Sequence, residues 1–259
     1  MNIKKTVFLV GSVIDVGKGS FHRMEDTRSY QPNNERFAQT VTGLNSIYNK
    51  FPNAKVFLID ASTKPSSYLT SPDTLGISKM VNKFGLEIIH LSQLDPIRVS
   101  ILNTHPNKSY CEALLYDTFL DHYADRLKEY DFIIKLSGRY NLTPNCNITS
   151  LQDKSDFYLK EIMDIANPNN EKWAYEHLMV PGQTGEVINW RASFCLGCGI
   201  DRLDDFKNLW KYVILMTKTS GVSIEVILNF WSWKHEINHK ELDWEILGFT
   251  GSEGYMWLL

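Results

Sequence analysis

Short apolar runs rich in β-branched residues alternate with helix-like segments over the first 140 residues of this chain. The runs are apolar at consecutive positions, as in strands that helices cover on both faces. In the segments between them, apolar residues recur every three to four positions, which is the period of an amphipathic helix. This alternation predicts an α/β fold, a single domain with a Rossmann-like, mostly parallel sheet flanked by helices, whose ligands bind beyond the carboxyl ends of the strands. The expected strands are 6–10, 55–60, 86–91 and 131–136, and the expected helices are 36–48, 75–84 and 109–127.

The second half of the chain is less regular. No linker, internal repeat or low-complexity segment separates it from the first half, so we treat the 259 residues as one structural unit. We expect strands at 157–159 and 189–198, helices at 202–216 and 224–233, a helix or turn at 171–179, and a glycine-rich loop at 248–254.

Charge and composition narrow the classes of function. The formal net charge is −3, whereas proteins that bind nucleic acid backbones are usually strongly basic, so no nucleic-acid partner is expected. No run reaches the ~18 apolar residues of a membrane-spanning helix, and the first apolar run is too short for a signal peptide. The four cysteines are too few for a disulfide scaffold of this length. We therefore expect a cytoplasmic protein without an integral membrane segment, associated at most with a membrane surface.

The first strand is followed by a near match to a phosphate-binding loop. In residues 11–20, Gly17 follows Gly11 by six positions, where the P-loop pattern requires five. Gly19 stands where that pattern needs a magnesium-binding hydroxyl. We interpret residues 15–34 as a long polar loop, of the kind that often carries function, and not as a true P-loop.

The end of the fourth strand offers a clearer anion site. The strand 131–136 delivers Lys135, Ser137, Gly138 and Arg139 to one edge of the sheet. Glycine allows the backbone to approach a ligand closely, an arginine fork suits phosphate, and a lysine adds a point charge. Two cations at a strand end predict a diphosphate site, and a salt-bridged strand end is the alternative.

Asp60 ends the second strand and has two interpretations. A carboxylate at this place accepts hydrogen bonds from a ribose or a base in nucleotide-binding folds. Alternatively it caps a turn, because Ser62 and Thr63 follow it.

Several short stretches, taken in order, resemble bacterial and viral glycosyltransferases of the GT-A type. They are Arg36-Phe-Ala-Gln-Thr40 with Leu44-Asn-Ser-Ile47, Ala54-Lys-Val-Phe-Leu-Ile-Asp-Ala-Ser62, Lys108-Ser-Tyr-Cys-Glu112 and Ile134-Lys-Leu-Ser-Gly-Arg-Tyr140. The resemblance covers about residues 6–142. It implies that 1–142 is a nucleotide-sugar-binding half, that 143–259 is the acceptor-binding half of the same domain, and that a sugar is transferred to a glycan or glycolipid. The residues expected to bind the donor are Gly11, Ser12, Arg36, Asp60, Lys135, Ser137, Gly138 and Arg139.

The chain departs from that family at one important place. GT-A enzymes commonly end the fourth strand in Asp-x-Asp, which holds a divalent metal, whereas this chain has Ser137-Gly138-Arg139. Stabilising the charge of the leaving diphosphate is the chemical requirement, and cations such as Lys135 and Arg139, joined by Arg36, meet it. We therefore expect no cofactor and no metal ligand here, with Mn²⁺ or Mg²⁺ entering only through a carboxylate site elsewhere. The departure also leaves open a non-catalytic nucleotide-sugar-binding module.

A transferase that inverts the anomeric centre needs a general base, usually a carboxylate, whereas a retaining one does not. The second half offers Glu161, Glu176, His177, Asp201 and Glu225, of which we favour Glu225 as the catalytic residue. The acceptor would lie against Trp173, Trp190 or Trp231.

Two further motifs favour other chemistry. Cys195-Leu-Gly-Cys198 has the spacing of redox and zinc sites, but Cys111 and Cys146 are isolated and supply no second pair. His235-Glu236-Ile-Asn-His239 matches H-E-x-x-H, which on a helix places two zinc-binding imidazoles on one face. A zinc metallohydrolase, with Glu245 or Glu253 as third ligand, is therefore the alternative enzyme.

Overall fold

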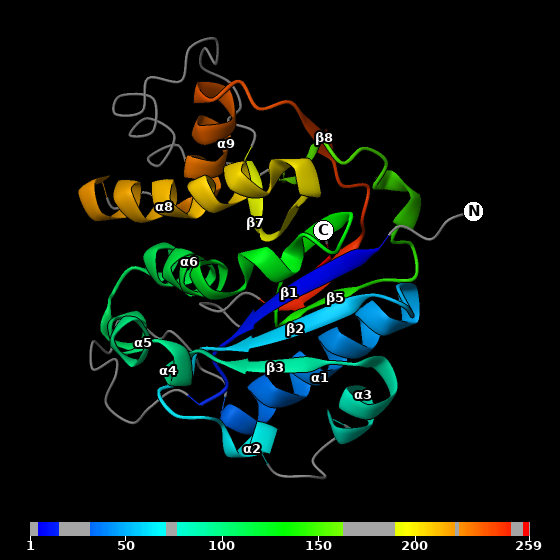
Figure 1. Cartoon of the computed structure of the whole chain (residues 1–259), viewed down its shortest axis with the longest axis vertical. Coiled ribbons are helices and arrows are strands. Elements are labelled where there is room, and N and C mark those ends of the chain that lie inside the picture. Colours follow the sequence, from blue (N-terminus) through cyan, green and yellow to red (C-terminus); the bar gives the residue numbers. More distant parts are fainter. Residues whose placement is uncertain are drawn as a thin grey trace.

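A seven-stranded sheet in the order β3-β2-β1-β4-β7-β6-β8 forms the centre of the computed structural model (Figure 1). The structure describes residues 5–15, 32–70, 77–162, 190–220, 223–249 and 256–258. The strands of this sheet are β1 (Thr6–Ser12), β2 (Lys55–Asp60), β3 (Glu87–His90), β4 (Phe132–Ser137), β6 (Phe157–Ile162), β7 (Trp190–Gly199) and β8 (His239–Glu241).

The sheet is mostly parallel. β1 pairs in parallel with both β2 and β4, and β2 pairs in parallel with β3. β7 pairs antiparallel with β4 and β6, whereas β6 and β8 are parallel to each other. Among the described strands of this sheet, β7 therefore runs against the rest. The expected α/β fold with a mostly parallel sheet is confirmed at this level.

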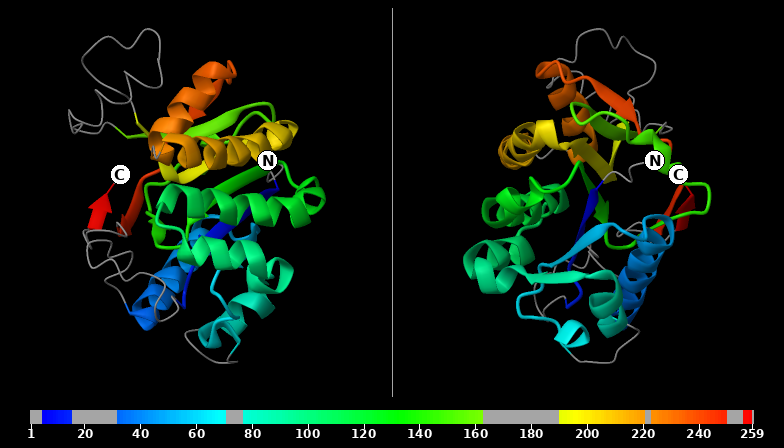
Figure 2. Two further views of the ribbon diagram at one scale, coloured as in Figure 1. Left: turned by 90° about the vertical axis from the view of Figure 1, so that its left-hand side faces the viewer. Right: turned by 45° about the vertical axis from the view of Figure 1, so that its right-hand side comes forward.

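Helices cover both faces of the sheet, as the two views in Figure 2 show. On one face lie α1 (Asn33–Lys50) and α3 (Ile77–Phe84), and on the other α5 (Pro96–Thr104), α6 (Lys108–Leu127), α8 (Leu203–Ser220) and α9 (Ile224–Lys234). Alternate residues of β1 face the two layers, because successive strand side chains point to opposite sides. Leu9 belongs to the core under α6, and Phe8 to the core under α1.

A small second sheet brings the end of the chain to the carboxyl end of β4. It has the order β10-β9-β5 and consists of β5 (Tyr140–Leu142), β9 (Ile246–Phe249) and β10 (Met256–Leu258). β5 also lies against α1 at Gly43, where an added Cβ would be 2.9 Å from the carbonyl oxygen of Tyr140. Glycine is therefore needed at this contact.

The strands and helices expected in the first half are present, with boundaries within three residues. The structure adds short elements that the sequence analysis did not predict: α2 (Ser67–Thr70), α4 (Leu91–Leu94), α5, β5, β8, β9 and β10, and 3₁₀ turns at Ile148–Ser150 and Ile200–Arg202. Residues 171–179, and most of the expected loops at 15–34 and 248–254, lie outside the described residues.

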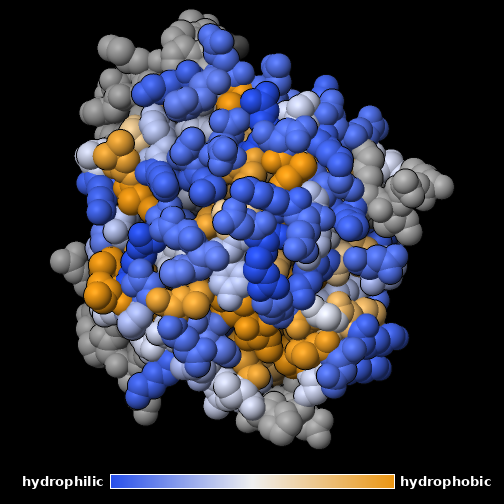
Figure 3. Space-filling model, in the orientation of Figure 1, coloured by the Kyte–Doolittle hydropathy of each residue, from blue (hydrophilic) through white to orange (hydrophobic). Residues whose placement is uncertain are grey.

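The face of the molecule drawn in Figure 3 has no dominant apolar region. In Figure 3, apolar residues emerge in separate patches among hydrophilic ones. The large apolar side chains exposed in the described part are Val81, Ile97, Ile101 and Leu215. No described helix combines the length and the apolar character that crossing a bilayer requires.

The strand order places a crevice between β1 and β4. From β1 the chain proceeds to β2 and β3 on one side, and then returns to β4 on the other side of β1. Along the chain, β1 is therefore followed by strands on one side of it in the sheet, whereas β4 is followed by β6 and β7 on the other side. In open α/β sheets, such a reversal is where ligands bind.

Candidate functional site

A cavity of about 410 Å³ lies at this reversal, between the carboxyl ends of β1 and β4 and the amino ends of α6 and α9. Its volume is in the usual range for small-molecule sites, about 300–1,000 Å³. The structure brings seven of the residues predicted from sequence together in its lining: Gly11, Ser12, Arg36, Ser137, Gly138, Arg139 and Glu225.

Two glycines form the floor of the cavity. The Gly138 amide donates to the carbonyl oxygen of Gly11 at 2.9 Å, so the ends of β4 and β1 lie against each other. A Cβ on Gly138 would be 3.0 Å from that same oxygen, and one on Gly11 would be 2.6 Å from the Tyr116 hydroxyl. That hydroxyl accepts a hydrogen bond from the Gly11 amide at 3.1 Å. Both positions therefore require glycine for close packing.

Two guanidinium groups converge on the cavity. Arg36, from α1, is buried and donates from Nε to the carbonyl oxygen of Val13 at 2.8 Å, with a second bond from Nη2. Burial, and the positive charge of Arg139, lower the pKa of Arg36 to about 10, so it remains protonated at neutral pH. Burial also lowers the pKa of Arg139. Two like charges brought together in a half-buried space favour binding of an anion.

Of these two guanidinium groups, that of Arg139 has N–H donors available to a ligand. Within the described part of the chain, its guanidinium has neither a hydrogen-bond nor an ion-pair partner. A guanidinium carries five N–H donors in a planar fork that matches phosphate and carboxylate oxygens. An arginine that is partly desolvated and still unpaired is suited to a ligand with at least one phosphate or carboxylate group.

Lys135 differs from its predicted role. Its side chain is fully buried, and its ammonium donates to Glu112, to Ser137 Oγ at 3.0 Å and to the carbonyl oxygen of Ser193. An ammonium has three hydrogens, and all three have acceptors here. Lys135 therefore lies beneath the cavity wall and does not present a point charge to a ligand.

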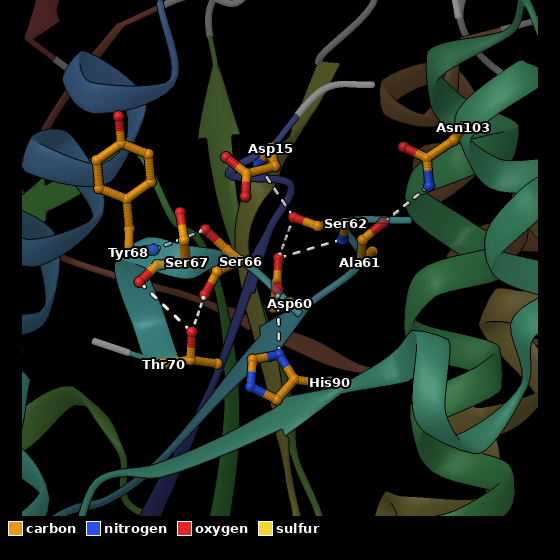
Figure 4. A network of polar contacts seen from close by, with 10 residues as sticks. All are labelled: Asp15, Asp60, Ala61, Ser62, Ser66, Ser67, Tyr68, Thr70, His90 and Asn103. Carbon is orange, nitrogen blue, oxygen red and sulfur yellow. Dashed lines mark hydrogen bonds and ion pairs between the residues drawn. The ribbon is translucent and has the colours of Figure 1, made fainter. Parts of the chain in front are cut away.

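Asp60 also lies away from the cavity, in a polar network beneath the ends of β1, β2 and β3 (Figure 4). It is 1% exposed, and it accepts from the backbone N–H and the hydroxyl of Ser62, at 3.1 and 2.6 Å. Its other oxygen is 3.2 Å from Nδ1 of His90. Ser62 Oγ accepts in turn from the amide of Asp15. The geometry is that of the turn alternative, because every contact of Asp60 joins strand ends.

Glu225 lies in the first turn of α9 and lines the cavity. The Ser193 hydroxyl donates to its carboxylate at 2.6 Å. Burial raises the pKa of Glu225, and the nearby charge of Glu112 adds to this effect. A carboxyl group whose pKa is raised toward neutrality is suited to general acid–base chemistry.

The sequence analysis did not predict Glu112 as a site residue, although it lines the cavity from α6. The signal was present, since Lys108–Glu112 is one of the stretches that carry the family resemblance. The amino ends of α6 and α9 are joined here, because Ser109 Oγ accepts from the amide of Ile224 at 3.0 Å. The two glutamates therefore approach the same cavity from two linked helix ends.

The remaining residues proposed for the acceptor half do not meet at this cavity in the described structure. Asp201 is exposed in the 3₁₀ turn after β7. Trp231 is 2% exposed, and its ring centroid is 5.2 Å from that of Phe157, so it is part of the core and offers no face to a sugar. Trp173, Glu176 and His177, the side chains of Glu161 and Trp190, and the loop residues Gly17 and Lys18 lie outside the described part.

The H-E-x-x-H segment lacks the helix that its zinc-binding geometry needs. α9 ends at Lys234, His235 and Glu236 lie in a turn, and His239 begins β8. Glu236 has a φ of 50°, in the left-handed region, which interrupts any helical register between the two histidines. His235 packs instead against the ring of Trp231, with centroids 5.6 Å apart. This geometry does not support the zinc hydrolase alternative.

The C-x-x-C pair does not form a site either. Cys195 and Cys198 are both on β7, and an odd spacing in a strand directs two side chains to opposite faces. Cys195 lies in the core under α1 and Cys198 in the core under α8. Burial raises the pKa of Cys195 to about 12, so its thiol is neutral and unreactive.

Comparison with known proteins adds no assignment: no family model matches the sequence, and no curated protein matches it.

Proposed function

We propose that this chain is a glycosyltransferase of the GT-A type that binds a nucleotide-sugar in the cavity between β1 and β4. The observation that carries the proposal is the Arg139 guanidinium, which lies beside Arg36 and has no partner among the described residues, because it calls for an anionic group in the ligand. A nucleotide-sugar supplies a diphosphate or a phosphate. The resemblance of residues 6–142 to the donor-binding half of these enzymes, and the strand order of the sheet, support the same class.

The proposed chemistry divides the cavity into two sides. The diphosphate would lie against Arg139 and the free edge of Arg36, whose positive charges stabilise the leaving group as the glycosidic bond to the nucleotide breaks. Glu225 would accept the proton of the acceptor hydroxyl as that oxygen attacks the anomeric carbon. The acceptor is a glycan or a glycolipid in this proposal.

Metal independence is part of the proposal. The turn after β4, where the family commonly has two aspartates, presents Ser137, Gly138 and Arg139 to the cavity. Two arginines supply the positive charge that a divalent ion would otherwise bring.

A thermal-shift screen against UDP, GDP, CMP and their sugars, each with EDTA or with Mn²⁺, tests the proposal. A ligand that binds only the folded state raises the melting temperature by mass action. We expect one nucleotide family to raise it in EDTA. A shift that requires Mn²⁺ would refute metal independence, and no shift with any nucleotide would refute the donor site.

Arg139→Gln is the matching variant, since it keeps a polar side chain and removes the charge. We expect the affinity for the nucleotide found in the screen to fall about 10- to 100-fold, as for the loss of a charged hydrogen-bonding partner. Arg202→Gln is the control, because Arg202 donates to the carbonyl oxygen of Ser155 outside the cavity. Equal affinities of these two variants would argue against a phosphate contact at Arg139.

A further inference from the structure

Two opposite charges line the cavity without forming an ion pair with each other. Glu112 on α6 and Arg139 after β4 are close enough for the carboxylate to act on the pKa of Arg139. Glu112 is nevertheless paired with Lys135, and Arg139 has no ion-pair partner among the described residues. A carboxylate within electrostatic reach of an open guanidinium would close onto it unless another contact held it back.

Lys135 provides that contact from beneath the cavity wall. Its side chain is fully buried, and Glu112 is the one acidic group paired with its ammonium among the described residues. A buried ammonium without a counter-charge is strongly unfavourable, so Glu112 cannot leave it at low cost. Glu112 Oε1 is the atom that accepts from the ammonium.

Two side chains on one face of α6 determine the position of the Lys135 ammonium. Glu112 and Tyr116 are four residues apart and therefore lie side by side on the helix. The Lys135 ammonium is 5.4 Å from the centroid of the Tyr116 ring, and it also donates to Ser137 Oγ and the Ser193 carbonyl. The lysine is thus fixed from three elements, α6, β4 and β7, and it fixes Glu112 in turn.

We infer that Lys135 is a positioning residue: it holds Glu112 against the cavity wall and so keeps the Arg139 guanidinium open for an anionic group of the ligand. The inference rests on the anion binding in the proposed function, but it does not depend on sugar transfer. It also accounts for a buried lysine that is not part of the cavity lining but whose ammonium contacts two residues of that lining, Glu112 and Ser137.

A double-mutant cycle on anion affinity tests this role. In Lys135→Met, Glu112 loses its partner and is free to pair with Arg139, so inorganic pyrophosphate must compete with it. We expect pyrophosphate affinity, measured by calorimetry at fixed ionic strength, to fall about fivefold. Adding Glu112→Gln removes the competing carboxylate, and the double variant should bind within about twofold of the wild type. A lysine that only supports the fold would not be rescued in this way.

A second measurement covers the case in which Lys135→Met does not fold. In the wild-type protein, the ¹⁵Nε–¹H signal of Arg139, assigned with Arg139→Gln, should show an unpaired guanidinium.

The outcomes separate the two proposals. Wild-type protein that binds neither pyrophosphate nor any nucleotide would refute the donor site itself. Two other results would overturn the positioning role and leave the donor site intact. In the first, the wild type binds pyrophosphate, but Lys135→Met and the double variant bind it equally weakly. In the second, the Arg139 signal shows an ion-paired guanidinium already in the wild type.

Discussion

At the scale of single residues, Glu225 is the acidic side chain at the cavity wall on which the proposed proton transfer depends. Its carboxylate accepts from Ser193, and burial raises its pKa. A general base acts only when it is ionised, so turnover should increase as pH rises through this elevated pKa. Glu225→Gln should lower kcat at least about 100-fold and leave nucleotide affinity within about twofold.

Initial rates of sugar transfer or donor hydrolysis, together with nucleotide titrations, check this expectation. A Glu225→Gln variant that retains wild-type turnover would exclude the residue as the base. A variant that loses nucleotide affinity to the same extent as turnover would place Glu225 in binding instead.

For Asp60 we expect the opposite, a contribution to the stability of the fold and none to ligand binding. It is the acceptor for two donors of Ser62 and lies next to His90 Nδ1, all in a buried network (Figure 4). Asp60→Ala should lower the free energy of unfolding by about 2–4 kcal/mol, because it leaves buried donors without an acceptor. Asp60→Asn, which keeps one acceptor oxygen, should cost less. Urea denaturation measures both, and a loss of nucleotide affinity without loss of stability would restore the ribose-contact interpretation.

Sequence predicts some site residues better than others for a physical reason. Gly138 and Arg139 follow directly after a strand end, so the local pattern alone places them at the edge of the sheet. The orientation of Lys135 depends on Glu112 and on Ser193, which is 58 positions away along the chain. No local pattern contains those partners, so the sequence analysis placed Lys135 against the ligand, whereas its ammonium lies beneath the cavity wall.

At the scale of elements, the contact between β1 and α6 sets the back of the cavity. An added Cβ on Gly11 would be 2.6 Å from the Tyr116 hydroxyl and 3.2 Å from a methyl carbon of Leu115. Gly11→Ala should therefore lower stability by about 1–3 kcal/mol through overpacking. Tyr116→Phe in the same chain removes the hydroxyl and should recover part of that loss.

The full cycle of both single variants and the double variant, followed by chemical denaturation, gives the coupling energy. Purely additive effects would mean that the strain is not between these two residues.

Elements differ in how far the sequence determines them. The strands and long helices of the first half have apolar patterns that repeat over their whole length, and they were predicted to within three residues. β5, β8, β9 and β10 have three or four residues each, too few to show a period. α5 has a weak amphipathic pattern, and its start depends on the capping of the Arg98 amide by Asp95 at 2.9 Å. Of the four short strands, β5, β8 and β9 form because segments that are distant in the sequence pair with them.

At the scale of the whole molecule, Glu225 links stability to pH. Its pKa in the folded chain lies above its ordinary value of 4.5, so between these two values the folded state binds more protons than the unfolded state. The free energy of unfolding therefore decreases as pH rises through that window. At lower pH, Glu225 is protonated in both states, and this destabilisation is absent. The melting temperature of Glu225→Gln minus that of the wild type should be larger at pH 8 than at pH 4.

Glu241→Gln is the control for this comparison, because Glu241 is exposed on β8. An equal pH dependence in the two variants would show that Glu225 is not the group responsible.

The reactivity of the buried cysteines can report on two properties of the molecule, the occupancy of the cavity and the opening of the central sheet. All are buried and unbridged, and Cys195 and Cys198 lie on opposite faces of the central sheet. A thiol-alkylating reagent can reach these two only when the sheet opens, so their labelling rate follows the opening equilibrium. Cys111 is 8% exposed and lines the cavity, where a ligand bound as proposed would cover it. Peptide mapping after one alkylation pulse would thus measure two properties in the same sample. The extent of labelling of Cys111 would report whether the cavity is occupied, and that of Cys195 and Cys198 would report whether the central sheet has opened.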